Sequence, residues 1–198
     1  MQTRYLKQIE SDLPYPTQRM PLLAGEIKGV KRLSQVAKIF FDGNSAAKTF
    51  VAENVQAQST ALTTPLEDIR ARIQPNGHRR TVFFAGKGGV GKTVASCITA
   101  VWLARQGHKT LLLTTDPAAH LGDVLDSPVG DEIAPVPGQP NLWAVKIDPK
   151  AAAETYKERI LEDARQRGRP ESAIATMEEE LNSPCTEEMA AFDKFIEY

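Results

Sequence analysis

Residues 81–115, TVFFAGKGGVGKTVASCITAVWLARQGHKTLLLTT, decide the fold. The apolar, β-rich run at 81–85 predicts a buried strand, and the run at 109–115 predicts a second. Between them lies a segment with apolar positions on one helical face, which Gly107 can end. A third apolar run, 142–147, is a further strand candidate. Strands that alternate with helices indicate a parallel α/β sheet.

A glycine-rich octet stands between the first strand and its helix. It fits the phosphate-loop pattern G-x-x-x-x-G-K-[ST] and consists of Gly86, Lys87, Gly88, Gly89, Val90, Gly91, Lys92 and Thr93. The glycines let backbone amides point inward around a phosphate, at the positive end of a helix. Lys92 can reach the terminal phosphates, and the Thr93 hydroxyl can bind Mg²⁺. The octet therefore predicts a nucleotide site.

Lys87 is a cation that the pattern does not require. It is either a solvated loop lysine or a second cation that reaches a phosphate across an interface between two halves or two subunits. The residues alone do not separate these interpretations.

Composition sets the broad class. The chain has 198 residues, a net charge of −1, 41% apolar residues and 25% charged residues, which is typical of a soluble globular protein with no overall attraction to nucleic acid. No apolar run approaches the roughly 18 residues of a membrane helix, and the start lacks the apolar core of a signal peptide. We therefore expect a cytoplasmic protein whose Cys97 and Cys185 are thiols.

Charge divides the chain into three blocks. Residues 1–80 hold 12 basic and 7 acidic side chains, 81–150 hold 6 and 6, and 151–198 hold 6 and 12.

In the first block, apolar residues between Val30 and Phe41 share one face of a predicted helix, which Gly43 and Asn44 can end. The polar stretch 42–77 indicates an interdomain linker or, alternatively, a floppy N-terminal extension. The last block predicts helices at 151–166, 171–181 and 184–198.

Three stretches carry a resemblance to a family. The octet GKGGVGKT resembles the deviant phosphate loop of the ATPases that include the arsenical-pump, tail-anchored-protein targeting, partitioning and nitrogenase iron proteins. LLTTDPAAHLGD at 112–123 resembles the switch segment of the arsenite and tail-anchor branch. LNSPCTEEMAAF at 181–192 resembles the cysteine segment of the arsenical-pump branch.

The resemblance also implies a division of the chain. PLLAGEIKGVKRLSQVAKIF at 21–40 is similar to the closing strand and helix of the same fold. We therefore expect residues 1–41 to end one ATPase half, 42–77 to be the linker and 78–198 to begin a second half. The expected fold is an incomplete α/β, P-loop NTPase-like parallel sheet with flanking helices and a helical insertion at its C-terminal end. The family's second switch, a strand ending in Asp-Thr-Ala-Pro, is not found in the sequence, so we expect the 198 residues alone to be inactive.

By resemblance, Lys92 and Thr93 take the phosphate and magnesium roles, and Lys87 is the signature lysine that crosses an interface. Asp116 matches the switch aspartate that orients the attacking water. A second role is also chemically possible, because an aspartate after a strand can be the acidic residue that binds Mg²⁺ in a phosphate-loop enzyme. His120 is more simply a helix-start or surface residue. Asp148 most simply caps the next helix ahead of Pro149.

The cysteines differ in their expected roles. Cys97 lies among apolar residues of the phosphate-loop helix, where a buried thiol is the ordinary outcome. Cys185 follows Ser183-Pro184, which predicts a helix start, and that position favours a thiolate although Glu187 and Glu188 oppose it. The resemblance implies that Cys185 is a ligand for arsenite or antimonite.

The resemblance therefore implies a MgATP-hydrolysing module that energises extrusion of arsenite or antimonite, with the metalloid as allosteric activator. Its implied partners are the other ATPase half, as an intramolecular pseudo-dimer, or a homodimer, and an integral membrane pump that would hold it at the inner membrane; nucleic acid is not expected. The alternative is a targeting ATPase for tail-anchored membrane proteins. A third interpretation is a nucleotide-binding fragment without turnover.

Overall fold

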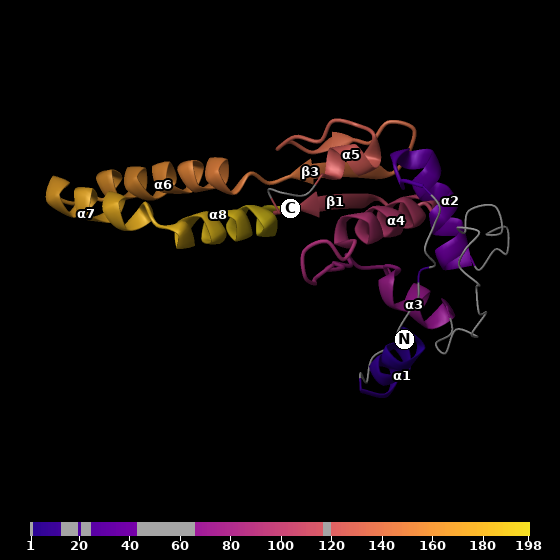
Figure 1. Cartoon of the computed structure of the whole chain (residues 1–198). Helices are drawn as coiled ribbons and strands as arrows, with labels where there is room; N and C mark the ends of the chain where they lie inside the picture. Colours follow the sequence, from indigo (N-terminus) through magenta and orange to yellow (C-terminus); the bar gives the residue numbers. More distant parts are fainter. Residues whose placement is uncertain (1, 13–19, 21–24, 43–65, 117–119) are drawn as a thin grey trace.

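The computed structural model describes residues 2–12, 20, 25–42, 66–116 and 120–198. They form an α/β fold with a three-stranded sheet, helices on its faces and a helical arm that projects from one edge (Figure 1). The elements in chain order are α1 (Gln2–Asp12), α2 (Gly29–Asp42), α3 (Leu66–Ile73), α4 (Lys92–Arg105), β1 (Thr110–Thr114), α5 (Leu121–Leu125), β2 (Ala134–Pro135), β3 (Leu142–Lys146), α6 (Pro149–Gln166), α7 (Glu171–Leu181) and α8 (Pro184–Glu197).

The sheet has the order β1-β3-β2. β1 and β3 are parallel, with Thr110 opposite Leu142 and Thr114 opposite Lys146, as the two apolar runs predict. The short β2 is antiparallel to β3, with Ala134 opposite Ala144. The predicted α/β class with a parallel pairing is thus confirmed, whereas the antiparallel edge has no counterpart among the sequence-based expectations.

Helix α4 packs against the sheet and is the centre of the core. Its buried residues are Cys97, Ile98, Thr99, Ala100, Val101, Trp102 and Ala104. The helix ends as the sequence predicts, because Gly107 adopts a φ of 90° and its amide donates back to the Ala104 carbonyl at 3.1 Å. The chain then reverses direction into β1.

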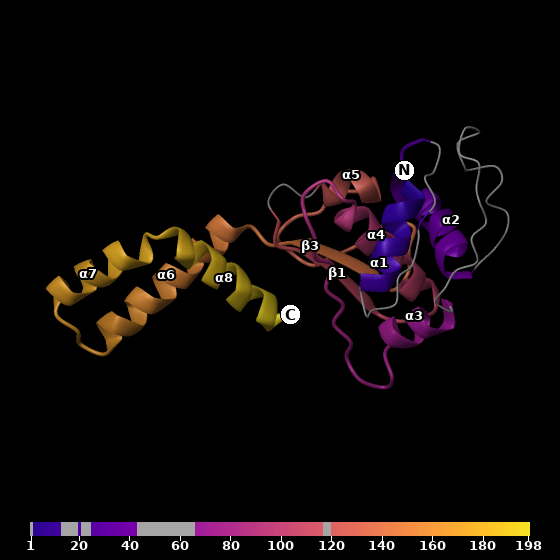
Figure 2. The ribbon, with the colours of Figure 1, turned by 60° about the horizontal axis from the view of Figure 1, so that its bottom comes forward.

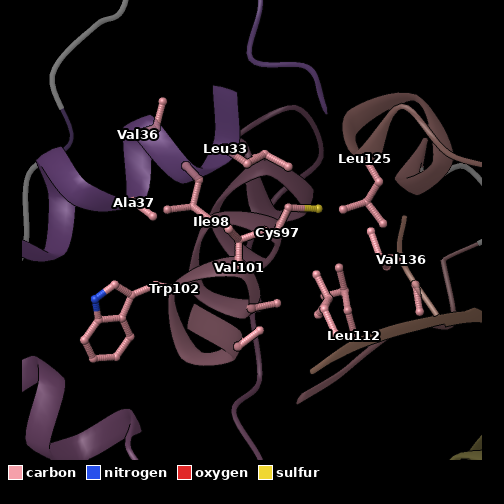
Figure 3. Packing of buried hydrophobic residues seen from close by; sticks show 14 of the residues in the cluster. Leu33, Val36, Ala37, Cys97, Ile98, Val101, Trp102, Leu112, Leu125 and Val136 are labelled. Carbon is pink, nitrogen blue, oxygen red and sulfur yellow. The ribbon is translucent and has the colours of Figure 1, made fainter. Parts of the chain in front are cut away.

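Helix α2 lies across α4 in the same core (Figure 3). Leu33 and Ala37 point towards α4, Val36 is buried in the same cluster, and Phe41 stacks on Trp102 with ring centroids 4.5 Å apart. The Trp102 indole Nε1 donates to Asp42 Oδ1 at 3.3 Å, and Arg70 of α3 lies 3.7 Å from the same oxygen. The block before the phosphate loop is therefore part of one hydrophobic core with it.

The arm consists of α6, α7 and α8, at the predicted positions (Figures 1 and 2). α7 packs on α6 through Leu161, Ala164 and Ile174, while α8 lies along α6 and turns back towards the sheet. Arg159 of α6 donates to Asp193 of α8 at 2.7 Å. The acidic C-terminal block thus forms the three expected helices.

Three parts of the chain differ from expectation or lie outside the described residues. Residues 81–85 form no strand, and Phe83 is 73% exposed. A strand needs a neighbour for its backbone hydrogen bonds, and none of the described strands runs beside this segment. Helix α3 occupies 66–73 of the expected linker, while 43–65, with Gly43 and Asn44, lie outside the described residues. In the stretch 21–40, which is expected to hold the closing strand and helix, residues 21–24 also lie outside the described residues, and 25–28 form no strand.

Candidate phosphate-binding site

The phosphate loop leads directly into α4. Gly91 is the N-cap with φ 90° and ψ 20°, and Gly89 has φ 77°, both in the left-handed region that favours glycine. No side chain of the described residues caps this helix start, and its first turn holds no acidic residue. The free amides of the first turn are therefore open to an anion, which the helix dipole also attracts.

The Lys92 side chain folds back over the loop. Its Nζ donates to the Lys87 carbonyl at 3.2 Å, so the ammonium group lies within the arc of the loop. A Cβ on Gly86 would lie 3.3 Å from Val90 Cγ2 and 4.0 Å from Lys92 Cδ. A larger residue at position 86 would thus crowd the loop beneath the lysine.

Thr93 and Lys87 occupy different surroundings. Thr93 is half-buried in the first turn of α4, and its carbonyl accepts from the Ser96 hydroxyl at 2.9 Å. Lys87 is exposed at the loop surface. In that position its amine is accessible to another ATPase half or a second subunit. The same exposure is also expected of a solvated loop lysine.

Asp116 lies two residues beyond the end of β1. Its amide donates to Thr114 Oγ1 at 3.2 Å, and its side chain is exposed. Because α4 reverses into β1, the first turn of α4 and the end of β1 lie at the same edge of the sheet. The structure thus brings Asp116 to the edge that carries Lys92 and Thr93.

Two neighbouring polar residues have the simpler roles expected of them. His120 is the N-cap of α5 and lies 3.3 Å from Asp123 at the surface. Asp148 follows β3 and caps α6 by accepting from the amides of Lys150 and Ala151, with Pro149 at the first turn. Neither side chain needs a catalytic role to account for its position.

The cysteines are separated by the fold. Cys97 is completely buried, and its burial raises the pKa of the thiol to about 12, against a smaller lowering by a hydrogen bond from Ser96. Cys185 is exposed in the first turn of α8, after the N-cap Ser183. The described residues contain no group of three or more His, Cys, Asp or Glu that could hold a metal ion.

An aromatic contact near the loop is absent from the sequence-based expectations. Phe83, before the phosphate loop, lies 5.7 Å from Phe195 of α8 between ring centroids, and Phe195 lies 6.2 Å from Phe192. The exposed Met189, Phe192 and Ile196 lie on α8 at intervals of three and four residues. Their helical spacing is a visible signal in the sequence, whereas the contact with Phe83 depends on how the arm folds back.

The loop fits ATP and Mg²⁺ on the chemistry of its donors. It combines open helix-start amides, an ammonium group within the loop arc and a hydroxyl in the first turn. Amides and an ammonium suit phosphate oxygens, and a threonine hydroxyl suits a hard cation. A phosphate loop ahead of a parallel strand pair defines a protein of the P-loop nucleotide-binding class.

Comparisons with known proteins narrow this class. Residues 79–198 match the anion-transporting ATPase family, and the chain belongs to that family. A protein of Halobacterium salinarum named "Putative arsenical pump-driving ATPase" is 42% identical over 191 residues, which cover 90% of this chain and 30% of the relative. That alignment extends into the block before residue 79.

Two further relatives show the range of the family. The arsenical pump-driving ATPase of Acidiphilium multivorum is 46% identical over 114 residues, 58% of this chain and 19% of the relative. The ATPase GET3 of Malassezia globosa is 37% identical over 112 residues, 54% of this chain and 33% of the relative. The chain spans a third or less of each of these relatives. Among the described helices, none has the length and apolar character to cross a bilayer.

Proposed function

We propose that this chain is part of an ATPase that binds and hydrolyses MgATP to energise extrusion of arsenite or antimonite through a separate membrane pump. The observation that carries the proposal is the Lys92 ammonium within the arc of an uncapped, glycine-shaped helix start. Family membership over 79–198 and the relatives named as arsenical pump-driving ATPases support the choice of reaction.

The proposed roles follow from position. Lys92 and the amides at the start of α4 would hold the β- and γ-phosphates, and Thr93 would hold Mg²⁺, which would supply positive charge to the phosphate oxygens. Asp116, at the same edge, orients the attacking water. Lys87 reaches from the loop surface to a nucleotide held by the other ATPase half or by a second copy. Each of these side chains is exposed or half-buried, so each can act without disturbing the core.

Cys185 is the proposed metalloid ligand of this chain. Trivalent arsenic is a soft centre that prefers several sulfur ligands, and this thiol is exposed on the first turn of α8. The remaining ligands would come from the matching segment of the other half and from parts of the full-length protein outside this chain, so that the metalloid would draw the two halves together over the nucleotides. The protein itself acts at the cytoplasmic side of the membrane, held there by the pump.

Replacement of Lys92 by alanine tests the nucleotide site. We expect Lys92→Ala to abolish MgATP binding in calorimetry while the circular dichroism spectrum stays unchanged, because this side chain at the start of α4 is not part of the hydrophobic core. Lys109→Ala, an exposed lysine outside the loop, is the matched control and should bind normally. Equal affinity in the two variants would refute the phosphate-loop assignment.

Replacement of Cys185 tests the metalloid role. In the full-length protein, Cys185→Ser should weaken arsenite stimulation of phosphate release without changing the unstimulated rate. Cys97→Ser is a poor control because that thiol is in the core, so Ser172→Ala, at an exposed serine of α7, serves instead. Full stimulation of the Cys185→Ser protein at the same arsenite concentration would exclude this cysteine.

A second candidate function is targeting of a protein with a hydrophobic membrane anchor. The exposed apolar residues Met189, Phe192 and Ile196 of α8 and the similarity to GET3 proteins favour it. Thermal shift of the full-length protein separates the two functions. Stabilisation by arsenite and not by an anchor peptide supports the pump ATPase, and the reverse result supports the targeting factor.

A further inference from the structure

An open cavity lies at the end of α4 that is remote from the phosphate loop. Its volume is about 710 Å³, and its walls come from α2, the last turn of α4 with Gly107, and residues 138–141 before β3. Figure 1 shows α2 beside this end of α4. Small-molecule sites typically measure roughly 300–1,000 Å³, so the cavity is large enough for a ligand.

Three cations line this cavity. Lys31 and Lys38 of α2 are seven residues apart and therefore lie on the same helix face, and Arg105 faces them from α4. Among the described residues, the lining contains no carboxylate, and no ion pair joins any of the three cations to another side chain. The cavity wall thus carries positive charge that the described part of the chain does not neutralise.

Helix stability does not account for this arrangement. A cation in the last turn of a helix is favoured by the helix dipole, which explains Arg105. Lys31, however, lies in the first turn of α2, where the same dipole opposes a positive charge. Lys31 and Lys38 therefore place two positive charges at the cavity, although the dipole of α2 disfavours the charge of Lys31.

The end of α4 does not repel an anion strongly. The amides of Gln106, Gly107 and His108 donate to the carbonyls of Trp102, Leu103 and Ala104 at 3.0–3.2 Å. These bonds satisfy three of the last carbonyls of the helix, and the Arg105 cation offsets the negative end of the helix dipole.

The other walls offer both polar and apolar contacts. Ser34 and Gln139 are 8% exposed and contribute polar groups, and Asn141 turns the chain with φ 63°. Val30 and Pro140 add apolar surface beside them. A ligand that fits this mixture has an anionic group and an uncharged organic body.

We propose that this cavity binds the phosphate group of a small phosphorylated organic solute, with Lys31, Lys38 and Arg105 around the phosphate. The site is separate from the nucleotide loop, because the 14 residues of α4 span about 21 Å between them. Since α2 and α4 both contact the ligand, its binding strengthens the packing of the N-terminal block on the phosphate-loop helix.

Calorimetry with three probes tests the site. The protein carries Lys92→Ala, so the phosphate loop does not contribute, and the probes are ribose 5-phosphate, inorganic phosphate and ribose. We expect ribose 5-phosphate to bind most tightly, inorganic phosphate more weakly and ribose not at all, with affinity falling as salt rises. Lys31→Ala/Lys38→Ala should weaken ribose 5-phosphate binding by roughly tenfold or more.

The matched control removes two lysines outside the cavity. Lys7→Ala/Lys109→Ala has the same net charge as the cavity variant, and all four lysines are exposed, so neither variant disturbs the core. Affinity in the control should stay within about twofold of the parent. Equal affinities in the two double variants, or no binding of ribose 5-phosphate at about 10 mM, would overturn the proposal.

Discussion

At the scale of single residues, the position of Asp116 is compatible with two alternative chemical roles. It lies at the sheet edge that carries the phosphate loop, where a carboxylate can orient water or bind Mg²⁺. In the full-length protein we expect Asp116→Asn to keep MgATP affinity and to lose hydrolysis by at least about a hundredfold, because the amide cannot orient water as the carboxylate does. Parallel binding and phosphate-release assays check this, and Asp131→Asn, at an exposed aspartate before β2, is the control.

Loss of nucleotide affinity in Asp116→Asn would contradict the water-orienting role. It would assign this carboxylate to magnesium instead, and a matching loss of Mg²⁺ dependence would confirm that assignment.

The cysteines give a second prediction at this scale. Burial raises the pKa of the Cys97 thiol to about 12, so Cys97 stays protonated in the folded protein at pH 8. Because the thiolate is the nucleophile, iodoacetamide at pH 8 should modify Cys185 and leave Cys97 unmodified until the protein is denatured. Peptide mass spectrometry measures both sites. Modification of Cys97 at the rate of Cys185 without denaturant would show that the core around α4 opens readily.

At the scale of elements, the end of α4 makes a quantitative prediction. Gly107 has φ 90°, a conformation that costs a residue with a Cβ roughly 1 kcal/mol or more, and a Cβ added there would meet no other atom within 4 Å. Gly107→Ala should therefore lower the free energy of unfolding by about 1 kcal/mol through the backbone alone. Gly130→Ala also has open space but an ordinary φ, so it should change stability little. Chemical denaturation of both variants measures the difference.

The elements that could be predicted from the sequence are those whose stabilising pattern is local. The helices α4, α6, α7 and α8 follow from apolar spacing and caps such as Asp148, and the phosphate loop follows from its motif. The run 81–85 has the composition of a strand, yet a strand also depends on a partner elsewhere in the chain. Helix α3 lacks a strong pattern, and Arg70 contacts Asp42 across a long separation in sequence.

The residues of the candidate site also differ in whether a local sequence pattern predicts them. The motif predicts Lys92 and Thr93 as site residues, and the order of helix and strand brings Asp116 to the same end of the sheet. The contact of Phe83 with Phe195 joins the loop approach to the arm across more than a hundred residues, and no local pattern encodes it.

At the scale of the whole molecule, the N-terminal block contributes to the core of the phosphate-loop domain. Burial of Leu33, Val36 and Phe41 contributes roughly 1.5–3 kcal/mol each, and together this is comparable with the roughly 5–15 kcal/mol that stabilise a typical domain. A chain that begins at residue 66 should therefore have a markedly lower melting temperature and a red-shifted tryptophan emission, because Trp102 loses Phe41.

A chain that lacks only residues 1–12 provides the control, because the described side chains of α1 are exposed. It should melt within a few degrees of the 198-residue chain. If both shortened chains melted alike and kept the same emission maximum, the packing of α2 on α4 would not be a determinant of stability.

The junction between β3 and α6 has a mechanical consequence. β3 ends at Lys146 and α6 begins at Pro149, so only Ile147 and the capping residue Asp148 separate the strand from the arm. Ile147 is buried, and its amide donates to the Thr114 carbonyl at 2.9 Å, which leaves the joint little slack. With 18 residues, α6 is about 27 Å long, so a tilt of about 10° at the joint displaces its far end by roughly 5 Å. The arm is joined to the end of the sheet that carries the phosphate loop. A small rotation of α6 at that junction would therefore produce a much larger displacement of α7.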